Sequence, residues 1–203
     1  YYPSYKLREL ERKGITIPFE DDDKEILKNN TVDFLSFSYY ATHVVSGDER
    51  INEEIKNNPL ATLKNPYLGE ILYKRQDDPI GLRNTLNMYY DRYQKPLFIV
   101  ENGFGAIDVK EEDGSCHDPY RIDYLKRHIE ELKKACDDGC RVLAYCTWSY
   151  TDLLSWLNGY QKRYGFVYID REEDENSGTL NRYKKDSYYW YKKVIETNGE
   201  NLD

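Results

Sequence analysis

The sequence contains few of the residues that build metal centres or disulfide frameworks. It has four cysteines and three histidines in 203 residues, and no two cysteines form a Cys-x-x-Cys pair. Such scattered residues do not match the ligand spacing of structural zinc, so the sequence predicts no metal and no cofactor. Free thiols in a cytoplasmic protein are the expected state of Cys116, Cys136, Cys140 and Cys146.

Long apolar runs and an excess of basic residues are also missing. The chain has 37 acidic and 29 basic side chains, a formal net charge of −8, and its acidic and basic residues are interspersed. This balance disfavours a nucleic-acid partner, which would require a basic face. No apolar run approaches the length of a membrane span, and the first ten residues carry no signal-peptide core, so no membrane partner is expected.

The sequence does contain a repeated alternation of helical and strand patterns. Three of the helical patterns, at 21–29, 79–94 and 120–138, each precede a β-rich run, which is typical of βα units around a parallel sheet. In the closing helix Trp190 is predicted to pack rather than to bind ligand, and Lys184 and Lys185 before it are predicted to be solvated. The predicted helices span 21–29, 79–94, 120–138 and 187–195, and the predicted strands span 31–40, 96–100, 141–147 and 166–169.

A carboxylate stands where one of these predicted strands ends. The apolar run 96–100 leads directly into Glu101, Asn102 and Gly103. In a (β/α)8 barrel the reacting groups lie at the carboxyl ends of the strands, so Glu101 is a candidate nucleophile. The alternative is an ordinary turn, because Asn-Gly after a strand is a common turn signal.

The segment 147–165, TWSYTDLLSWLNGYQKRYG, gathers cationic, hydroxyl and aromatic side chains. An ammonium and hydroxyls offer donors for phosphate oxygens, and two indoles offer flat apolar faces for a sugar ring. These groups predict a site for a phosphorylated sugar. The alternative is a solvated amphipathic loop, since aromatic and basic residues share many surface loops. The candidate binding residues are Trp148, Ser155, Trp156, Lys162 and Tyr164.

Both motifs resemble those of glycoside hydrolase family 1, the retaining β-glucosidase-like enzymes. The family pattern WSxxDxxEWxxGYxKRFG is similar to 148–165, except that Ser155 replaces a glutamate that binds the hydroxyls of plain sugars. Removing that carboxylate removes a charge that would repel phosphate and makes room for the group. The chain therefore resembles the 6-phospho-β-glycosidase branch of the family.

This resemblance implies retaining hydrolysis of 6-phospho-β-D-glycosides. A 6-phospho-β-glucosidase is favoured, because the C-terminal stretch is similar to such enzymes. A 6-phospho-β-galactosidase or dual specificity is the alternative, since Trp156 after the serine resembles the galactosidases. The implied roles are Glu101 as nucleophile, Tyr40 as its hydrogen-bond partner, Trp148 and Trp156 as the walls of the sugar subsite, and Ser155, Lys162 and Tyr164 as the phosphate ligands.

The resemblance covers only the later part of the family's chain. The family's acid/base glutamate lies in a TxNEP-like motif, and Asn-Glu-Pro does not occur in the 203 residues. The expected fold is α/β, the C-terminal part of a (β/α)8 TIM barrel with about strands six to eight, and residues 1–203 are expected to form one partial domain without the N-terminal half. The expected partners are a 6-phosphorylated β-glycoside and that missing half, with a homo-oligomer left open.

Two alternative functions from other functional classes remain open for this chain. One is a sugar-phosphate binding protein that keeps the phosphate ligands and has no acid/base, and the other is an inactive fragment. The segment 44–78, which would border the aglycone, is similar to the family only loosely. The sequence therefore does not indicate which aglycone the substrate carries.

Overall fold

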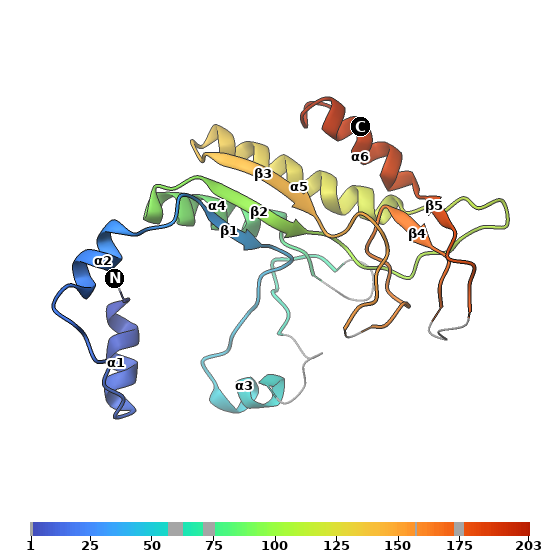
Figure 1. Ribbon diagram of the computed structural model, residues 1–203. Helices are drawn as coiled ribbons and strands as arrows, with labels where there is room; N and C mark the ends of the chain where they lie inside the picture. Colours follow the sequence, from blue (N-terminus) through green and yellow to red (C-terminus); the bar gives the residue numbers. More distant parts are fainter. Residues whose placement is uncertain (1, 57–62, 71–75, 157, 173–176) are drawn as a thin grey trace. The chain divides into compact units, whose positions relative to one another are not determined.

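Figure 1 shows the computed structural model of the chain. The structure describes residues 2–56, 63–70, 76–156, 158–172 and 177–203, so parts of the segment 44–78 lie outside the described residues. The chain forms two compact units, Tyr1–Leu35 and Ser36–Asp203. None of the described helices is both long and apolar enough to cross a bilayer.

The first unit consists of two short helices, α1 (Ser4–Arg12) and α2 (Asp23–Asn29). Neither helix contains a buried residue. Glu9 accepts from the ammonium groups of Lys6 and Lys13, both at 2.8 Å, and these bonds lower the pKa of Glu9 to about 2. Ion pairs at helical spacing therefore help to hold α1. The predicted helix 21–29 is confirmed as α2.

The second unit is built on a three-stranded sheet with the order β1-β2-β3. Strands β2 and β3 are parallel, with Leu97 opposite Val142 and Asn102 opposite Thr147. The predicted alternation of helices and parallel strands is thereby confirmed, and the three strands do not close into a barrel. The strands are β1 (Leu35–Ser38), β2 (Leu97–Asn102) and β3 (Val142–Thr147).

Strand β1 is shorter than the predicted strand 31–40. The alternation of side chains in that segment extends beyond the residues whose backbone pairs with a neighbouring strand. Directly after β1, Tyr39 N–H donates to the Glu101 carbonyl at 2.9 Å. This bond places Tyr39 and Tyr40 beside the end of β2.

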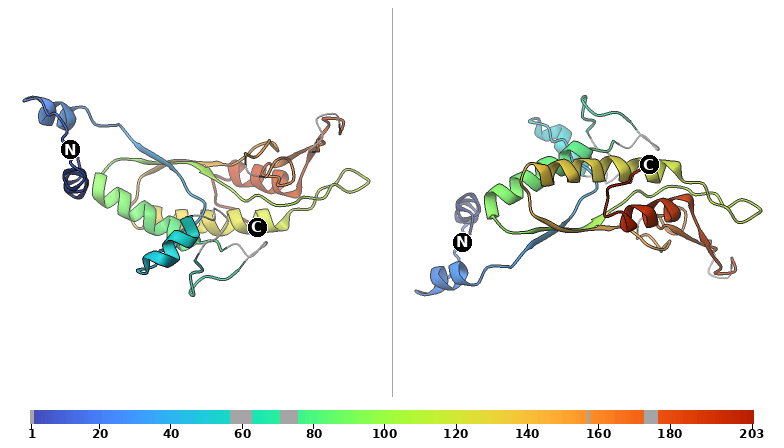
Figure 2. Two further views of the ribbon diagram at one scale, coloured as in Figure 1. Left: turned by 90° about the horizontal axis from the view of Figure 1, so that it is seen from below. Right: turned by 90° about the horizontal axis from the view of Figure 1, so that it is seen from above.

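The predicted helices of this unit are present, and α4 and α5 lie on the same side of the sheet in both views of Figure 2. Helix α4 starts at Pro79, and the Asp78 side chain accepts from Gly81 N–H at 2.9 Å as its N-cap. Among the described residues between β1 and α4 there is one further helix, α3. The helices are α3 (Glu49–Lys56), α4 (Pro79–Tyr93), α5 (Pro119–Asp137) and α6 (Asp186–Glu196).

The predicted arm at 166–169 is also confirmed. Strand β4 (Val167–Ile169) pairs antiparallel with β5 (Arg182–Lys184) to form a small hairpin after the loop 148–165.

The hydrophobic core of the unit lies between α5, α6 and the segment that follows β2. Trp190 belongs to this core, and its indole N–H donates to the Leu202 carbonyl at 3.1 Å. The prediction that Trp190 packs is confirmed. The buried members of the core are Phe104, Ala106, Tyr124, Leu125, Ile129, Phe166, Trp190 and Val194.

Candidate active site

Parallel strands bring their carboxyl ends to one edge of the sheet, and the predicted nucleophile lies there. Glu101 is the fifth residue of β2 and is half-buried. The Tyr40 hydroxyl donates to Glu101 Oε2 at 2.9 Å, so the predicted hydrogen bond is present. Burial, and then this bond to the carboxylate, raise the pKa of Tyr40 well above its ordinary value. Tyr40 therefore keeps its proton and remains a donor to the carboxylate.

Asn102, the residue after Glu101, connects the three strands beneath this pair. Its side chain is fully buried, and Nδ2 donates to the Tyr39 carbonyl at 2.7 Å and to Tyr124 Oη at 3.1 Å. Its Oδ1 accepts from Tyr145 Oη at 2.5 Å. From the sequence, Asn102 is expected only as part of a turn. A polar side chain next to a buried apolar strand is the signal that could have identified it.

Backbone contacts hold Trp148, which follows β3, against the end of β2 at Asn102 and Gly103. Trp148 N–H donates to the Asn102 carbonyl at 2.8 Å. A Cβ on Gly103 would lie 1.9 Å from the Trp148 carbonyl oxygen, so only glycine permits this approach. The Trp148 side chain is 37% exposed at the edge of the sheet, as expected of a residue that borders a binding site.

The loop 148–165 folds back on itself and brings two of the predicted phosphate ligands to one side chain. Ser155 and Gly159 exchange backbone hydrogen bonds of 2.9 and 3.0 Å, and Gly159 takes a positive φ of 55°. Asn158 Nδ2 donates to Ser155 Oγ and to Tyr164 Oη, both at 3.4 Å. Asn158 was not among the predicted residues, although it stands between them in the sequence.

The other end of this loop is held by the segment that follows Glu101. A Cβ on Gly105 would lie 2.3 Å from the ring of Tyr164, so that ring lies directly on the glycine. Ala106 and Arg163 exchange backbone hydrogen bonds of 3.0 and 2.7 Å. The phosphate-binding candidate Tyr164 is therefore tied to the strand that carries the nucleophile candidate.

The two remaining predicted residues of the loop are placed differently from each other. Lys162 is half-buried, two residues before Tyr164. Trp156 is fully exposed, and the structure does not bring it against the other predicted residues. Its role in the sugar subsite stays a prediction.

A buried ion cluster beneath the loop corrects the expectation that Lys185 is solvated. Lys185 is fully buried, and its ammonium donates to Asp108 and, at 2.7 Å, to Asp152 Oδ1. Arg121 pairs with Asp108 at 3.0 Å and with Asp118. Although burial opposes it, the charges of Arg121 and Lys185 hold the pKa of Asp108 below its usual range. The cluster links the loop to α5 and α6.

Arg163 extends this cluster, so the alternative of a solvated loop does not hold for Arg163. The guanidinium is buried and donates to the Ile169 carbonyl at 2.8 Å and to the Arg171 carbonyl at 2.5 Å. Its Nη1 lies 3.7 Å from Asp152 Oδ2. Asp152 also accepts from Gly165 N–H at 3.0 Å. Both ends of the loop are thus anchored on one carboxylate.

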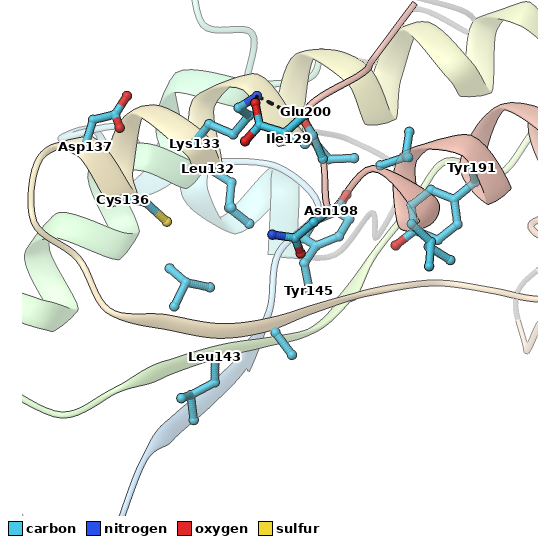
Figure 3. A pocket seen from close by; sticks show the side chains of 15 residues that line it. Ile129, Leu132, Lys133, Cys136, Asp137, Leu143, Tyr145, Tyr191, Asn198 and Glu200 are labelled. Atoms are coloured by element: carbon cyan, nitrogen blue, oxygen red, sulfur yellow. Dashed lines mark hydrogen bonds and ion pairs between the residues drawn. The ribbon is translucent and has the colours of Figure 1, made fainter.

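A separate groove of about 490 Å³ lies between α5, β3 and α6, and Figure 3 shows it lined by Ile129, Leu132, Tyr145 and Tyr191 among others. None of the seven predicted site residues lines it. In the described parts of the chain, no three His, Cys, Asp or Glu side chains are grouped to hold a metal ion, and the four cysteines are free thiols.

Comparison with known proteins yields one family. Residues 1–200 match the model of glycosyl hydrolase family 1. The chain is 54% identical to the aryl-phospho-β-D-glucosidase BglA of Bacillus subtilis (strain 168), over 100% of this chain and 43% of that protein. It is 49% identical to the 6-phospho-β-glucosidase AscB of Escherichia coli (strain K12), over 100% of this chain and 42% of that protein.

Two proteins named as β-glucosidases are similar at lower identity. β-Glucosidase A of Acetivibrio thermocellus is 33% identical, over 98% of this chain and 42% of that protein. A β-glucosidase from Thermotoga maritima, solved in complex with deoxynojirimycin, superimposes with a TM-score of 0.78 at 33% identity and covers 99% of this chain and 42% of that chain. The chain thus spans about 43% of the length of the curated relatives it matches.

Proposed function

The chain belongs to glycosyl hydrolase family 1, and on that premise we propose that it carries the nucleophile and the phosphate-binding site of a retaining 6-phospho-β-glucosidase. The observation that carries the proposal is the 2.9 Å hydrogen bond from Tyr40 to Glu101 at the carboxyl edge of the sheet. It holds a carboxylate, half-buried and oriented, at the place where barrel enzymes react.

In the proposed reaction Glu101 attacks the anomeric carbon while the bond to the aglycone oxygen breaks. A second carboxylic acid, about 5 Å away, protonates that leaving oxygen, and the same group then deprotonates the water that hydrolyses the glycosyl-enzyme. We assign this acid/base to the part of the relatives' length that this chain does not cover. Tyr40 keeps the Glu101 carboxylate aimed at the anomeric carbon for the first step.

The phosphate is proposed to bind at Ser155, Lys162 and Tyr164. Charge-assisted bonds from an ammonium and two hydroxyls suit phosphate oxygens, and Ser155 stands where plain-sugar members carry a carboxylate. The names of the relatives support this assignment: the protein that is 54% identical is an aryl-phospho-β-D-glucosidase, whereas the β-glucosidase from A. thermocellus is 33% identical.

The sugar is proposed to be the gluco epimer. The relatives of 48–54% identity are named as phospho-glucosidases or a phospho-cellobiase. The exposed Trp156 is the feature that would favour the galacto epimer. A cytoplasmic location is part of the proposal, because the four free thiols suit a reducing compartment.

The test is a hybrid enzyme in which these 203 residues replace the matching 43% of the B. subtilis relative. Hydrolysis is measured with the nitrophenyl β-glucoside, its 6-phosphate and the 6-phosphogalactoside. Turnover that depends on the 6-phosphate supports the proposal. Faster turnover of the 6-phosphogalactoside than of the 6-phosphoglucoside would contradict the gluco assignment and favour the galacto epimer. Binding of glucose 6-phosphate without turnover would instead indicate a binding protein.

A Glu101→Ala version of the hybrid tests the nucleophile. We expect turnover to fall by about three orders of magnitude or more. Azide can occupy the space of the lost carboxylate, attack the anomeric carbon from the same face and release the nitrophenolate. The product should then be the α-glycosyl azide, and a β-glycosyl azide would contradict the assignment of Glu101.

A further inference from the structure

Asn158 lies between two hydroxyls of the proposed phosphate site and donates to both. Its Nδ2 is 3.4 Å from Ser155 Oγ and 3.4 Å from Tyr164 Oη, and its backbone N–H is 3.3 Å from Ser155 Oγ. Ser155 Oγ therefore accepts twice from the same residue. All three side chains are half-buried.

These bonds determine which hydrogen-bonding role remains for the hydroxyls of Ser155 and Tyr164. A hydroxyl has one proton to donate and two lone pairs that accept. When N–H groups occupy the lone pairs, the proton remains to be donated to another acceptor. Within the described parts of the chain, neither Ser155 Oγ nor Tyr164 Oη donates to any acceptor. Both O–H groups are thus left to bind an anion.

The surrounding backbone fixes the distances that this arrangement needs. The Ser155–Gly159 backbone pair closes the turn on one side of Asn158. Gly105 lies against the Tyr164 ring and sets its position on the other side. One amide group can therefore reach both hydroxyls at the same time.

We infer that Asn158 is the positioning residue of the phosphate site: its amide occupies the acceptor side of Ser155 and Tyr164, so that both hydroxyls donate to the phosphate oxygens. This inference rests on the proposed function, because it takes Ser155 and Tyr164 to be phosphate ligands. It adds that their donor character is imposed by a neighbour that does not itself have to touch the sugar.

The test compares Asn158→Leu and Asn158→Asp, which keep the size of the side chain, with Asn158→Ala. The readout is the ratio of kcat/KM for the 6-phosphorylated and the plain nitrophenyl glucoside in the hybrid enzyme, together with the affinity of the full 203-residue chain for glucose 6-phosphate. Loss of an ordered donor should lower the ratio about 10-fold in the Leu and Ala variants, mainly through KM. The Asp variant should lose about 100-fold or more, because its carboxylate accepts from both hydroxyls and repels phosphate.

If Asn158 only supported the fold of the loop, the near-isosteric Asp and Leu variants would be more active than the Ala variant. KM and kcat would then change for both the phosphorylated and the plain substrate. Asn181→Leu, at an exposed position of another loop, is the matched control and should change nothing. If Lys162→Ala abolishes the phosphate preference while all three Asn158 variants keep it, the inference is overturned and the proposed function stands. If the unsubstituted proteins show no preference for the phosphorylated sugar, both are overturned.

Discussion

At the residue scale, the pair Tyr40 and Glu101 joins a phenol that stays protonated to the carboxylate proposed to react. The bond is part-buried, so little water competes for it. A hydrogen bond to a charged group contributes about 1.5–3 kcal/mol in proteins. Its loss should therefore be visible in catalysis even though the ring of Tyr40 remains.

We expect Tyr40→Phe to lower kcat of the hybrid enzyme by about 10- to 100-fold, because the carboxylate is no longer held towards the anomeric carbon. The measurement is kcat and KM for the phosphorylated nitrophenyl glucoside. Tyr67→Phe, at a tyrosine that is 93% exposed, is the control and should leave both values unchanged. Equal effects of the two substitutions would mean that the Tyr40 hydroxyl has no part in catalysis.

Adjacent lysines provide a second comparison at this scale. Lys185 is fully buried between Asp108 and Asp152, whereas Lys184 is exposed with its ammonium 4.7 Å from the ring centre of Tyr188. Lys185→Met should cost about 3–5 kcal/mol in the free energy of unfolding, because it removes the buried ammonium that Asp108 and Asp152 share. Lys184→Met should cost about 1 kcal/mol or less. Urea unfolding of the two variants measures the difference, and equal losses would contradict the burial of Lys185.

At the element scale, the carboxyl ends of β2 and β3 are held together through backbone atoms. Gly103 makes this possible, since a Cβ there would meet the Trp148 carbonyl. Gly103→Ala should destabilise the fold by about 1–3 kcal/mol and reduce turnover, because a backbone clash displaces either Glu101 or Trp148. Gly47→Ala is the control, since a Cβ at Gly47 has no atom within 4 Å. Unchanged turnover in Gly103→Ala would show that the approach of the two strands does not matter for the reaction.

The junction before α5 is connected to the start of α6 by a titratable pair. His117 Nδ1 lies 2.7 Å from Asp186 Oδ2, and the hydrogen bond to Asp186 raises the pKa of His117. A raised pKa in the folded state means that the pair stabilises the fold fully below the unfolded pKa of about 6.5, and that this contribution is lost as pH rises through the higher folded value.

Accordingly, His117→Asn should lower the free energy of unfolding most near pH 5.5, and the difference from the unsubstituted chain should shrink towards pH 9. Unfolding in urea at a series of pH values measures this. In an Asp186→Asn background the same substitution should lose its pH dependence. A difference that grows with pH would contradict the assignment of the pair.

At the scale of the whole molecule, the sheet keeps apolar side chains in contact with water. Val100 in β2 is 36% exposed and Leu143 in β3 is 49% exposed. Parallel sheets are normally covered on both faces, and open strand edges promote association between chains. We propose that a further part of the barrel covers these faces, since the chain matches 43% of the length of its B. subtilis relative.

We therefore expect the 203-residue chain to self-associate when produced alone. Co-expression with the uncovered part of the B. subtilis relative should raise the yield of soluble protein and restore hydrolysis of the 6-phosphoglucoside. Size-exclusion chromatography with light scattering, followed by the activity assay, measures both. A monomeric chain that is active by itself would contradict this expectation.

The sequence alone determined the elements and the candidate reacting groups. Periodicity located α4, α5, α6 and the two long strands to within a few residues, because amphipathic patterns, Pro79 and Pro119 act locally. The motif Glu101-Asn102-Gly103 predicted the nucleophile through the family resemblance, and the loop 148–165 predicted the candidate phosphate ligands in the same way. Such motifs are contiguous, so no tertiary information was needed to find them.

Only the tertiary structure decided which polar side chains are buried and what they hold. Asn102, Asn158 and Lys185 stand in stretches that look like ordinary turns or a solvated surface. Their partners, apart from those of Asn158, lie tens of residues away in the sequence, as with Lys185 and Asp108. Whether a charge is solvated or paired depends on the elements packed around it, because burial without a partner would cost several kcal/mol.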